Sequence, residues 1–341
     1  MPHMHAILES LRSGATLTED QSEAAFSSIL SGETGETDLA EFLTLIAARG
    51  PTIDELVGGA RVMRRHVTAV EVPATGAALI DTCGTGGAPK LFNVSTAGAV
   101  VTAAAAPGRV MVAKHGSLSR TGRGSAEVLQ ALGVNVAAAP AVQTRCLREI
   151  GLCFSFAVHH HPAMRHAAVV RKRLGFPTIF NLLGPLTNPA GARRQLMGTY
   201  SRDVAGKLAA TLHRLGVERS MVITSADGLD ELTTTALNHT WTIDGSGVTE
   251  GDFDANVSGF TRARIEELQV STLEDAAAAI RTVVSGGSGP LQDLVILNTA
   301  GSLFVAGVVR DIPEGTRMAR AALESGKAAR TLEALIRLTN E

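Results

Sequence analysis

Residues 77–87, AALIDTCGTGG, precede NVSTAGAVVTAAAA at 93–106 and VMVAKHG at 110–116, and this stretch decides the fold. The apolar runs predict strands at Ala77–Asp81 and Val110–Ala113. The glycines of Cys83–Gly87 predict a turn after the first strand, and Ser95–Ala106 is predicted as a helix. A strand, a turn, a helix and a second strand form the unit of parallel sheets. We therefore predict an α/β protein with a mainly parallel central sheet.

The alternation of helices and strands continues along the chain. Further helices are predicted at Ser125–Leu132 and Ala205–Leu215, and further strands at Leu196–Tyr200 and Ser220–Thr224. The last third is mostly helical in pattern, with predicted helices at 273–284, 291–303 and 314–338. These segments extend the same sheet and supply helices for both of its faces.

The first seventy residues have a different pattern, because apolar residues recur there only at helical spacing. Four helices are predicted, and Thr18 and Thr52 stand where N-caps are expected. Their ranges are Ala6–Ser13, Gln21–Leu30, Asp38–Arg49 and Thr52–His66. Pro162–Leu174 is also predicted as a helix that could return the chain to this unit. We expect a small helical domain at 1–70 with a returning segment near 162–190, and an α/β domain at 71–161 and 191–341.

Length, charge and cysteine content narrow the class of protein. The 341 residues suggest two domains, since single domains most often have roughly 100–150 residues. The 31 basic and 33 acidic residues give a net charge of −2, which disfavours nucleic acid as a partner. An odd count of three cysteines predicts reduced thiols. No secretory signal or membrane-length apolar run is apparent, so we expect a cytoplasmic protein with no membrane partner.

Two segments predict a phosphate site. Backbone N–H groups at Gly84 and Gly87 can converge on an anion, and Asn93, Ser95 and Thr96 open a helix whose N-terminus favours negative charge. A plain strand–turn–helix connection is the alternative. The second segment is Lys114-His115-Gly116, which follows a strand and precedes Ser117, Ser119 and Ser125. Lysine and hydroxyl groups there could contact phosphate, although the lysine alone would suit a solvated loop.

Asp230 and Glu231, in the run DGLDE at 227–231, are candidate magnesium ligands. Mg²⁺ takes one or two carboxylates together with water and substrate phosphate. From spacing alone, however, acids in the first turn of a helix are the favoured explanation.

The run HHHPAMR at 159–165 contains three successive histidines. Neighbouring side chains of an extended segment face opposite sides, so these histidines cannot all bind one metal, and we reject a zinc site. One histidine could face a cleft. The helix that follows is basic, and one of its arginines could hold a substrate carboxylate.

Together these motifs resemble the anthranilate phosphoribosyltransferase family, which shares its fold with pyrimidine nucleoside phosphorylases. The resemblance covers nearly the whole chain. The matching stretches are GTGG at 84–87, NVST at 93–96, KHG at 114–116, GSAEVLQALGV at 124–134, HHHPAMRH at 159–166, TIFNLLGPLTNP at 178–189 and DGLDEL at 227–232.

The resemblance implies two domains joined by a hinge, a homodimer through the helical domains, and a step in tryptophan biosynthesis. In that reaction anthranilate attacks C1 of phosphoribosyl pyrophosphate and pyrophosphate leaves. It implies that Mg²⁺ is held by Ser95, Asp230 and Glu231, and that His161 and Arg171 face anthranilate. The donor would be contacted by Gly84, Gly87, Asn93, Ser95, Thr96, Lys114 and Ser125. No residue is nominated as a catalytic acid, base or nucleophile.

Two loops depart from the family pattern. Ala88 stands where the family has Asp, and Ser117 stands where it has Asn. Both loops, 88–92 and 117–123, are also shorter, and the second contains Arg120 and Arg123, which singly are best explained as solvated loop residues. We hypothesise that donor and metal chemistry are retained while acceptor recognition is modified at Ser117. The alternatives are another aromatic or heterocyclic acceptor, and a non-catalytic binding protein.

Overall fold

The computed structural model describes residues 2–89, 91–119 and 122–341. The chain opens with the helices α1 (Pro2–Arg12), α2 (Glu19–Ser31), α3 (Glu36–Arg49) and α4 (Ile53–Arg65), as the apolar spacing predicts. Thr18 and Thr52 cap α2 and α4, each in a reciprocal box with Gln21 or Glu55. These local hydrogen bonds satisfy N–H groups that a helix start leaves unpaired, which is why both boundaries are visible in the sequence.

Within the described residues, seven strands form one sheet in the order β3-β2-β1-β4-β5-β6-β7. The first five strands run parallel, and β6 and β7 form an antiparallel hairpin at the edge. The predicted mainly parallel sheet is therefore confirmed. The strands are β1 (Ala78–Gly84), β2 (Val110–Gly116), β3 (Leu152–Phe156), β4 (Arg194–Gly198), β5 (Arg219–Ser225), β6 (Asn238–Asp244) and β7 (Gly247–Phe253).

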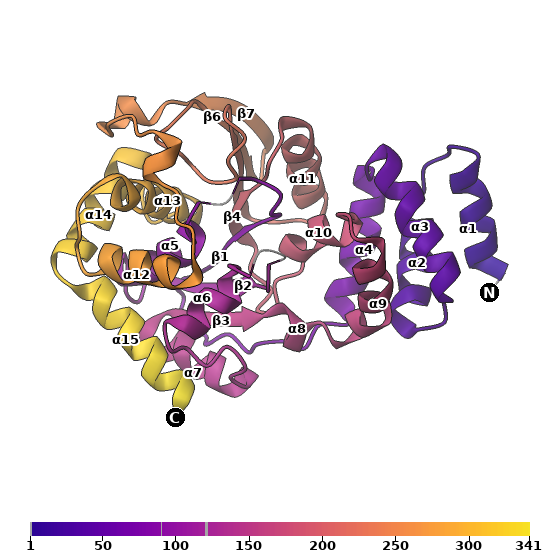
Figure 1. The fold of residues 1–341 in the computed structure, drawn as a ribbon, viewed down its shortest axis with the longest axis horizontal. Coiled ribbons are helices and arrows are strands. Elements are labelled where there is room, and N and C mark those ends of the chain that lie inside the picture. Colours follow the sequence, from indigo (N-terminus) through magenta and orange to yellow (C-terminus); the bar gives the residue numbers. More distant parts are fainter. Residues whose placement is uncertain (1, 90, 120–121) are drawn as a thin grey trace.

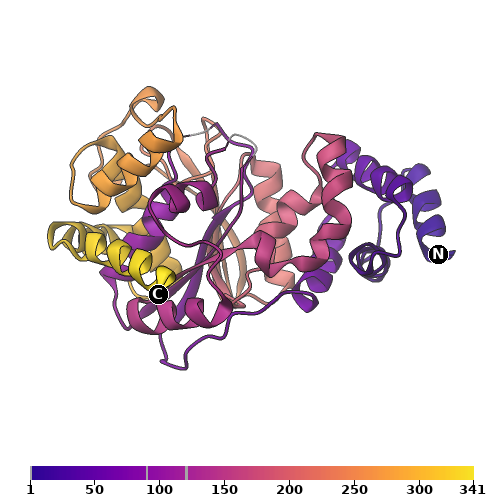
Figure 2. The same cartoon turned by 60° about the horizontal axis from the view of Figure 1, so that its bottom comes forward.

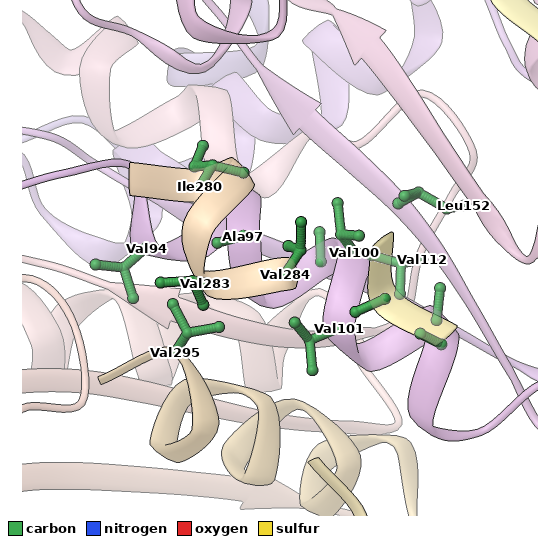
Figure 3. Close-up of a cluster of buried hydrophobic side chains, with 14 of the residues drawn as sticks. Val94, Ala97, Val100, Val101, Val112, Leu152, Ile280, Val283, Val284 and Val295 are labelled. Carbon is green, nitrogen blue, oxygen red and sulfur yellow. The ribbon is translucent and has the colours of Figure 1, made fainter. Parts of the chain in front are cut away.

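Helices cover both faces of this sheet (Figure 1). α5 (Val94–Ala105) and α13 (Pro290–Ala306) pack on one face, where α12 (Leu273–Val284) adds a further layer. Figure 3 shows side chains of α5, α12, α13, β2 and β3 meeting in this core, which is built almost entirely of Val, Ala, Leu and Ile. The remaining helices of this part are α6 (Ser125–Ala131), α7 (Pro140–Ile150), α14 (Ile312–Glu324) and α15 (Lys327–Asn340).

The opposite face of the sheet packs on α11 (Arg202–Arg214) and, through it, on the helical part. Met197 and Val222 of the sheet belong to the same apolar cluster as Phe26 and Phe42 of the N-terminal helices. The short helix α8 (Ala157–His160) leads to α9 (Arg165–Leu174) and α10 (Ile179–Leu183). α9 packs on α2 and α3, and α10 packs on α3 and α4. The helical part lies at one end of the molecule in both views (Figures 1 and 2).

The C-terminal helices correct one prediction. The expected single helix 314–338 is two helices, because Gly326 adopts a left-handed conformation with φ +66° and ends α14. The break lets α15 turn back and pack on α5 and α7. Among the described residues, no helix is both long and apolar enough to span a bilayer.

Candidate active site

The sheet order reverses between β1 and β4, because β1 leads to β2 on one side while β4 leads to β5 on the other. In open α/β sheets, ligands bind at the carboxyl ends of the strands at such a point. Here β1 ends at Gly84 and β4 ends at Gly198, and these two glycines are register partners. The glycine turn that the sequence singled out therefore lies at the topological switch point.

The turn after β1 is held against the end of β4. Thr85 donates its N–H to the Gly198 carbonyl at 3.0 Å, and its hydroxyl lies 3.1 Å from that of Thr199. Gly87 has φ +100°, and a Cβ there would come within 2.8 Å of the Tyr200 ring. Glycine is thus required at 87 both by the backbone and by the packed ring. The sequence predictions missed Thr199 and Tyr200, since nothing local indicates that the end of β4 meets this turn.

The N-terminus of α5 lies beside the same turn. Thr82 of β1 donates its hydroxyl to the Ser95 carbonyl at 3.0 Å, which joins the strand to the first turn of the helix. Thr96 is buried, and within the described part of the chain its hydroxyl has no hydrogen-bond partner. Asn93 precedes α5 without capping it through its side chain, and instead donates to the Arg123 carbonyl at 3.1 Å. In this first turn the Val94 and Thr96 N–H groups bond to the Phe92 and Asn93 carbonyls, and among the described residues the Ser95 N–H is left to face an anion.

Lys114 is buried at the carboxyl end of β2, with 3% of its surface exposed. Its ammonium donates to the Thr82 carbonyl at 2.6 Å and to the Ser95 hydroxyl at 3.2 Å. Burial lowers the pKa of Lys114, while the negative charges of Asp81 and Glu231 oppose that shift. The solvated-loop alternative for this lysine is wrong, because its charge lies between β1 and α5.

Gly116 and Ser125 bring the start of α6 against the end of β2. A Cβ on Gly116 would come within 2.1 Å of the Ser125 hydroxyl oxygen, so no larger residue fits there. Between them, the backbone N–H of Ser119 donates to the Glu127 carboxylate, and the Ser119 hydroxyl accepts the Arg123 N–H at 3.0 Å. Ser119 is therefore joined to both Glu127 and Arg123, while Ser117 stays exposed.

Arg123 corrects the expectation of a solvated loop residue. Its guanidinium donates to the Val270 carbonyl, which ties the loop to the segment before α12. Arg123 and Val270 are 147 positions apart in the sequence, so no local pattern indicates this contact. Arg120 and Lys90, in the two shortened loops, lie outside the described residues.

The segment that contains Asp230 and Glu231 is a loop between β5 and β6, so the helix-start explanation is wrong. Asn298 of α13 holds this loop by accepting the Leu232 N–H at 3.0 Å and donating to the Leu232 carbonyl at 2.7 Å. Asp227 instead accepts the hydroxyls of Ser225 and Thr235. Loop geometry thus separates a structural Asp227 from the two acids nearer the glycine turn.

Asp230 lies directly over the switch point. A Cβ on Gly84 would lie 3.4 Å from an Asp230 carboxylate oxygen, and a Cβ on Gly198 would lie 1.6 Å from its carbonyl oxygen. Glu231 and Ser95 line a common cavity of about 10 Å³ together with Asn298 and Ser302. The fold therefore brings four sequence-predicted features together at one end of the sheet: the glycine turn, the start of α5, Lys114 and the acidic pair.

The three histidines take three different environments. His159 is exposed and lies edge-on against Phe156. His160 is buried and donates from Nδ1 to the Thr68 carbonyl at 2.6 Å, so its Nε2 accepts from the Gln143 amide at 2.9 Å. His161 places Nε2 at 3.3 Å from Nε2 of His115. Burial lowers the pKa of His161 to about 4 and that of His115 well below its ordinary value, so both rings are neutral at pH 7.

Arg171 lies on α9, in the helical part. Its guanidinium carbon lies 5.2 Å from the centre of the Phe180 ring, and a terminal nitrogen lies 3.5 Å from the Asn181 side-chain oxygen. Burial lowers the pKa of Arg171, but arginine stays charged at any physiological pH. No carboxylate pairs with it among the ion pairs of the described residues.

Comparison with known proteins decides the family. Residues 76–329 match the glycosyl transferase family α/β domain, and residues 5–67 match the helical bundle domain of the same family. The chain is 42% identical to anthranilate phosphoribosyltransferase of Rubrobacter xylanophilus, over 97% of this chain and 96% of that one. The chain belongs to the anthranilate phosphoribosyltransferase family.

Solved structures of the family agree with this fold. Anthranilate phosphoribosyltransferase from Thermus thermophilus has a TM-score of 0.90 and 36% identity, covering 98% of this chain and 99% of that one. The enzyme from Saccharomyces cerevisiae in complex with PRPP and Mg has a TM-score of 0.88 at 24% identity, covering 99% and 98%. The predicted arrangement of a small helical domain and a larger α/β domain is confirmed.

The oxygen donors at the switch point fit Mg²⁺ bound together with water and substrate phosphate, rather than a metal ion held by protein side chains alone. Ser95, Asp230 and Glu231 offer hard oxygen donors, and Ser95 and Glu231 line one small cavity. Within 2–89, 91–119 and 122–341, no group of three or more His, Cys, Asp or Glu side chains could hold a metal ion. Mg²⁺ typically keeps several waters and combines one or two carboxylates with substrate phosphate, so two acids suffice.

Ala88 and Ser117, the two residues expected to differ from the family pattern, lie towards the solvent. Ala88 is half-buried after the glycine turn, and Ser117 is exposed after Gly116. The neighbouring Leu118 is 54% exposed, so the loop after β2 presents an apolar side chain to solvent beside Ser117. The lysine, the helix start and the acidic pair lie below these positions and are retained.

Proposed function

We propose that this protein transfers the 5-phosphoribosyl group of phosphoribosyl pyrophosphate to the amine of anthranilate, releasing pyrophosphate, as a step of tryptophan biosynthesis. One observation carries the proposal. A chain 42% identical to an anthranilate phosphoribosyltransferase brings a glycine turn, a helix N-terminus, a buried lysine and two carboxylates to one switch point. This set is complementary to a sugar pyrophosphate with its metal.

The donor side neutralises the negative charge of the leaving group. Backbone N–H groups at Gly84–Gly87 and the N-terminus of α5 face the pyrophosphate, and Lys114 adds a positive charge. Ser95, Asp230 and Glu231 would hold Mg²⁺, which supplies further neutralisation of the pyrophosphate when bound. Asn93, Thr96, His115, Gly116 and Ser125 complete the donor contacts, and Ser119 supports them from within its loop.

On the acceptor side, Arg171 holds the carboxylate of anthranilate while Ser117 and His161 border its ring. The neutral His161 adds no positive charge that would repel the forming cation at C1. The amine nitrogen forms its bond to C1 as the bond from C1 to the pyrophosphate oxygen breaks, and that oxygen takes the electron pair. The amine then loses its extra proton to water or to pyrophosphate. An aromatic amine is already neutral at pH 7, so no catalytic base is required.

We also propose the division into a helical domain, 1–70 with a returning segment near 162–190, and an α/β domain, 71–161 and 191–341. The contacts of α9 and α10 with α2, α3 and α4 support it. Lys114 and Arg171 come from different domains, so a hinge motion would bring donor and acceptor together and exclude water. Comparing small-angle scattering with and without both substrates tests the hinge.

A homodimer through the helical domain is a further proposal. Val169 of α9 and Phe176, just after it, are 62% and 37% exposed. Exposed apolar side chains on a small helical unit favour a covering partner. Light scattering of the purified protein should give twice the chain mass of 35.4 kDa.

A second acceptor remains the alternative, and the exposed Ser117 and Leu118 favour it. Serine offers one hydroxyl where the family has an amide, which alters the hydrogen bonds available to the acceptor.

The deciding experiment follows the fluorescence of anthranilate mixed with the protein, Mg²⁺ and phosphoribosyl pyrophosphate. The proposed function predicts a steady loss of signal that requires the metal. No loss, together with calorimetric binding of the donor, would point to another aromatic amine or heterocycle. Absence of donor binding would contradict the transferase function itself.

A further inference from the structure

β1 changes its partner in the middle of the strand. Its residues Ala78–Ile80 pair with β2, whereas Asp81–Gly84 pair with β4. β2 continues past this point and pairs with β3 as far as Gly116. From Asp81 onward, β1 and β2 therefore have no backbone ladder between them, and a seam opens at the carboxyl end of the sheet.

Side chains bridge this seam in place of the ladder. Successive residues of a strand direct their backbone groups to opposite sides, so the Ala113 carbonyl and the His115 N–H both face β1. The His115 N–H donates to the Asp81 carboxylate at 3.0 Å, and the Ala113 carbonyl accepts from the Asn188 amide at 2.8 Å. Buried backbone groups need such partners, and here no strand supplies them.

The third bridge is the lysine of the donor site. Lys114, between Ala113 and His115, donates across the seam to the Thr82 carbonyl on β1. Its position therefore depends on how far the two strands separate. Asp81 and Asn188 act on the residues immediately before and after it.

Burying the carboxylate of Asp81 costs free energy, and its bond to the strand β2 compensates for part of that cost. Asp81 is fully buried, and among the described residues only one of its two carboxylate oxygens, Oδ1, accepts a hydrogen bond of ordinary geometry. Burial raises the pKa of Asp81, and the charge of Lys114 opposes that rise. An apolar residue would avoid this cost, but it would leave the His115 N–H without a partner.

We propose that Asp81, assisted by Asn188, is a positioning residue that holds the seam between β1 and β2 open and thereby aims Lys114, His115 and Gly116 at the donor. This inference rests on the proposed function for the identity of the donor. Both residues bond to backbone groups of β2, so both would act on the donor site through that strand.

Three variants test the role. Asp81→Asn keeps an oxygen for the His115 N–H, Asp81→Ala removes it, and Asn188→Ala removes the bridge to Ala113. Glu55→Gln is the matched control, because Glu55 is also a fully buried acid that accepts backbone N–H groups, but in the helical part. Each variant is measured for KM of phosphoribosyl pyrophosphate, KM of anthranilate, kcat and melting temperature.

We expect Asp81→Ala and Asn188→Ala to raise KM for the donor about tenfold or more, as loss of a charge-assisted or buried hydrogen bond typically does. KM for anthranilate should stay at the wild-type value, and Asp81→Asn should largely restore the donor KM. Hydrogen exchange of the substrate-free protein gives a second readout. The segment containing His115 should exchange faster in Asp81→Ala and at the wild-type rate in Asp81→Asn and Glu55→Gln.

The outcomes separate the two proposals. Absence of turnover in the wild type would reject the proposed function, whereas the exchange measurement needs no substrate. With an active wild type, equal changes in both KM values, or only a lower melting temperature as in Glu55→Gln, would show a merely structural role and overturn the inference. If Asp81→Ala does not fold, an unchanged donor KM in Asn188→Ala overturns it instead.

Discussion

Gly198→Ala probes how closely the acidic loop is fitted to the sheet. Its Cβ would lie 1.6 Å from the Asp230 carbonyl oxygen and 2.6 Å from the carbonyl carbon. Ordinary contacts begin near 3.4 Å, so the loop with Asp230 and Glu231 must move by more than 1 Å. A misplacement of about 1 Å can cost on the order of 10²-fold in rate. We expect kcat/KM to fall by about that factor, with a higher Mg²⁺ concentration needed for half-maximal activity.

The assay is the anthranilate fluorescence decay over a series of Mg²⁺ concentrations, with melting temperatures measured in parallel. Overpacking itself should cost about 1–3 kcal/mol of stability. Gly206→Ala is the control, because that Cβ would lie 3.8 Å from Trp241, in ordinary contact, and helix α11 tolerates alanine. If Gly198→Ala kept wild-type activity and metal dependence, the placement of the acidic pair against β4 would be refuted.

Three further predictions concern charge. Lys114→Met should weaken the binding of phosphoribosyl pyrophosphate, measured by calorimetry, by about tenfold or more, because a hydrogen bond to a charged group is worth ~1.5–3 kcal/mol. If the variant bound phosphoribosyl pyrophosphate as tightly as the wild type, Lys114 would not contact the donor. Arg171→Ala should raise KM for anthranilate by a similar factor with the donor KM unchanged, and an unchanged anthranilate KM would remove Arg171 from the acceptor site. Burial lowers the pKa of His161 to about 4, so its stability contribution is complete above about pH 6.5 and declines as the pH falls towards 4, by about 2 kcal/mol at pH 5. Urea unfolding at pH 7 and pH 5 measures it, and His161→Gln should lose less stability between these values than the wild type.

The sequence predicts those parts of the protein whose causes are local. The caps at Thr18 and Thr52 act within three residues, so the starts of α2 and α4 are visible in the pattern. The apolar strand, glycine turn and hydroxyl-rich helix start likewise indicate an anion site without any structure. The β6–β7 hairpin also has a local signal, because the two residues Gly245-Ser246 join its strands and Asp244 pairs with Gly247 across them.

Only the tertiary structure decides which of these segments meet and what holds them. The change of partner at Asp81 depends on β4, more than a hundred positions later, and Asn298 holds the acidic loop from 66 positions away. From its neighbours in sequence Arg123 is best explained as a solvated loop residue, but its partner, the Val270 carbonyl, lies 147 positions away. A residue's local pattern determines its backbone and polarity, whereas burial and hydrogen-bond partners arise from segments that the pattern does not connect. For that reason the kinds of site residues could be predicted here, and the framework that positions them could not.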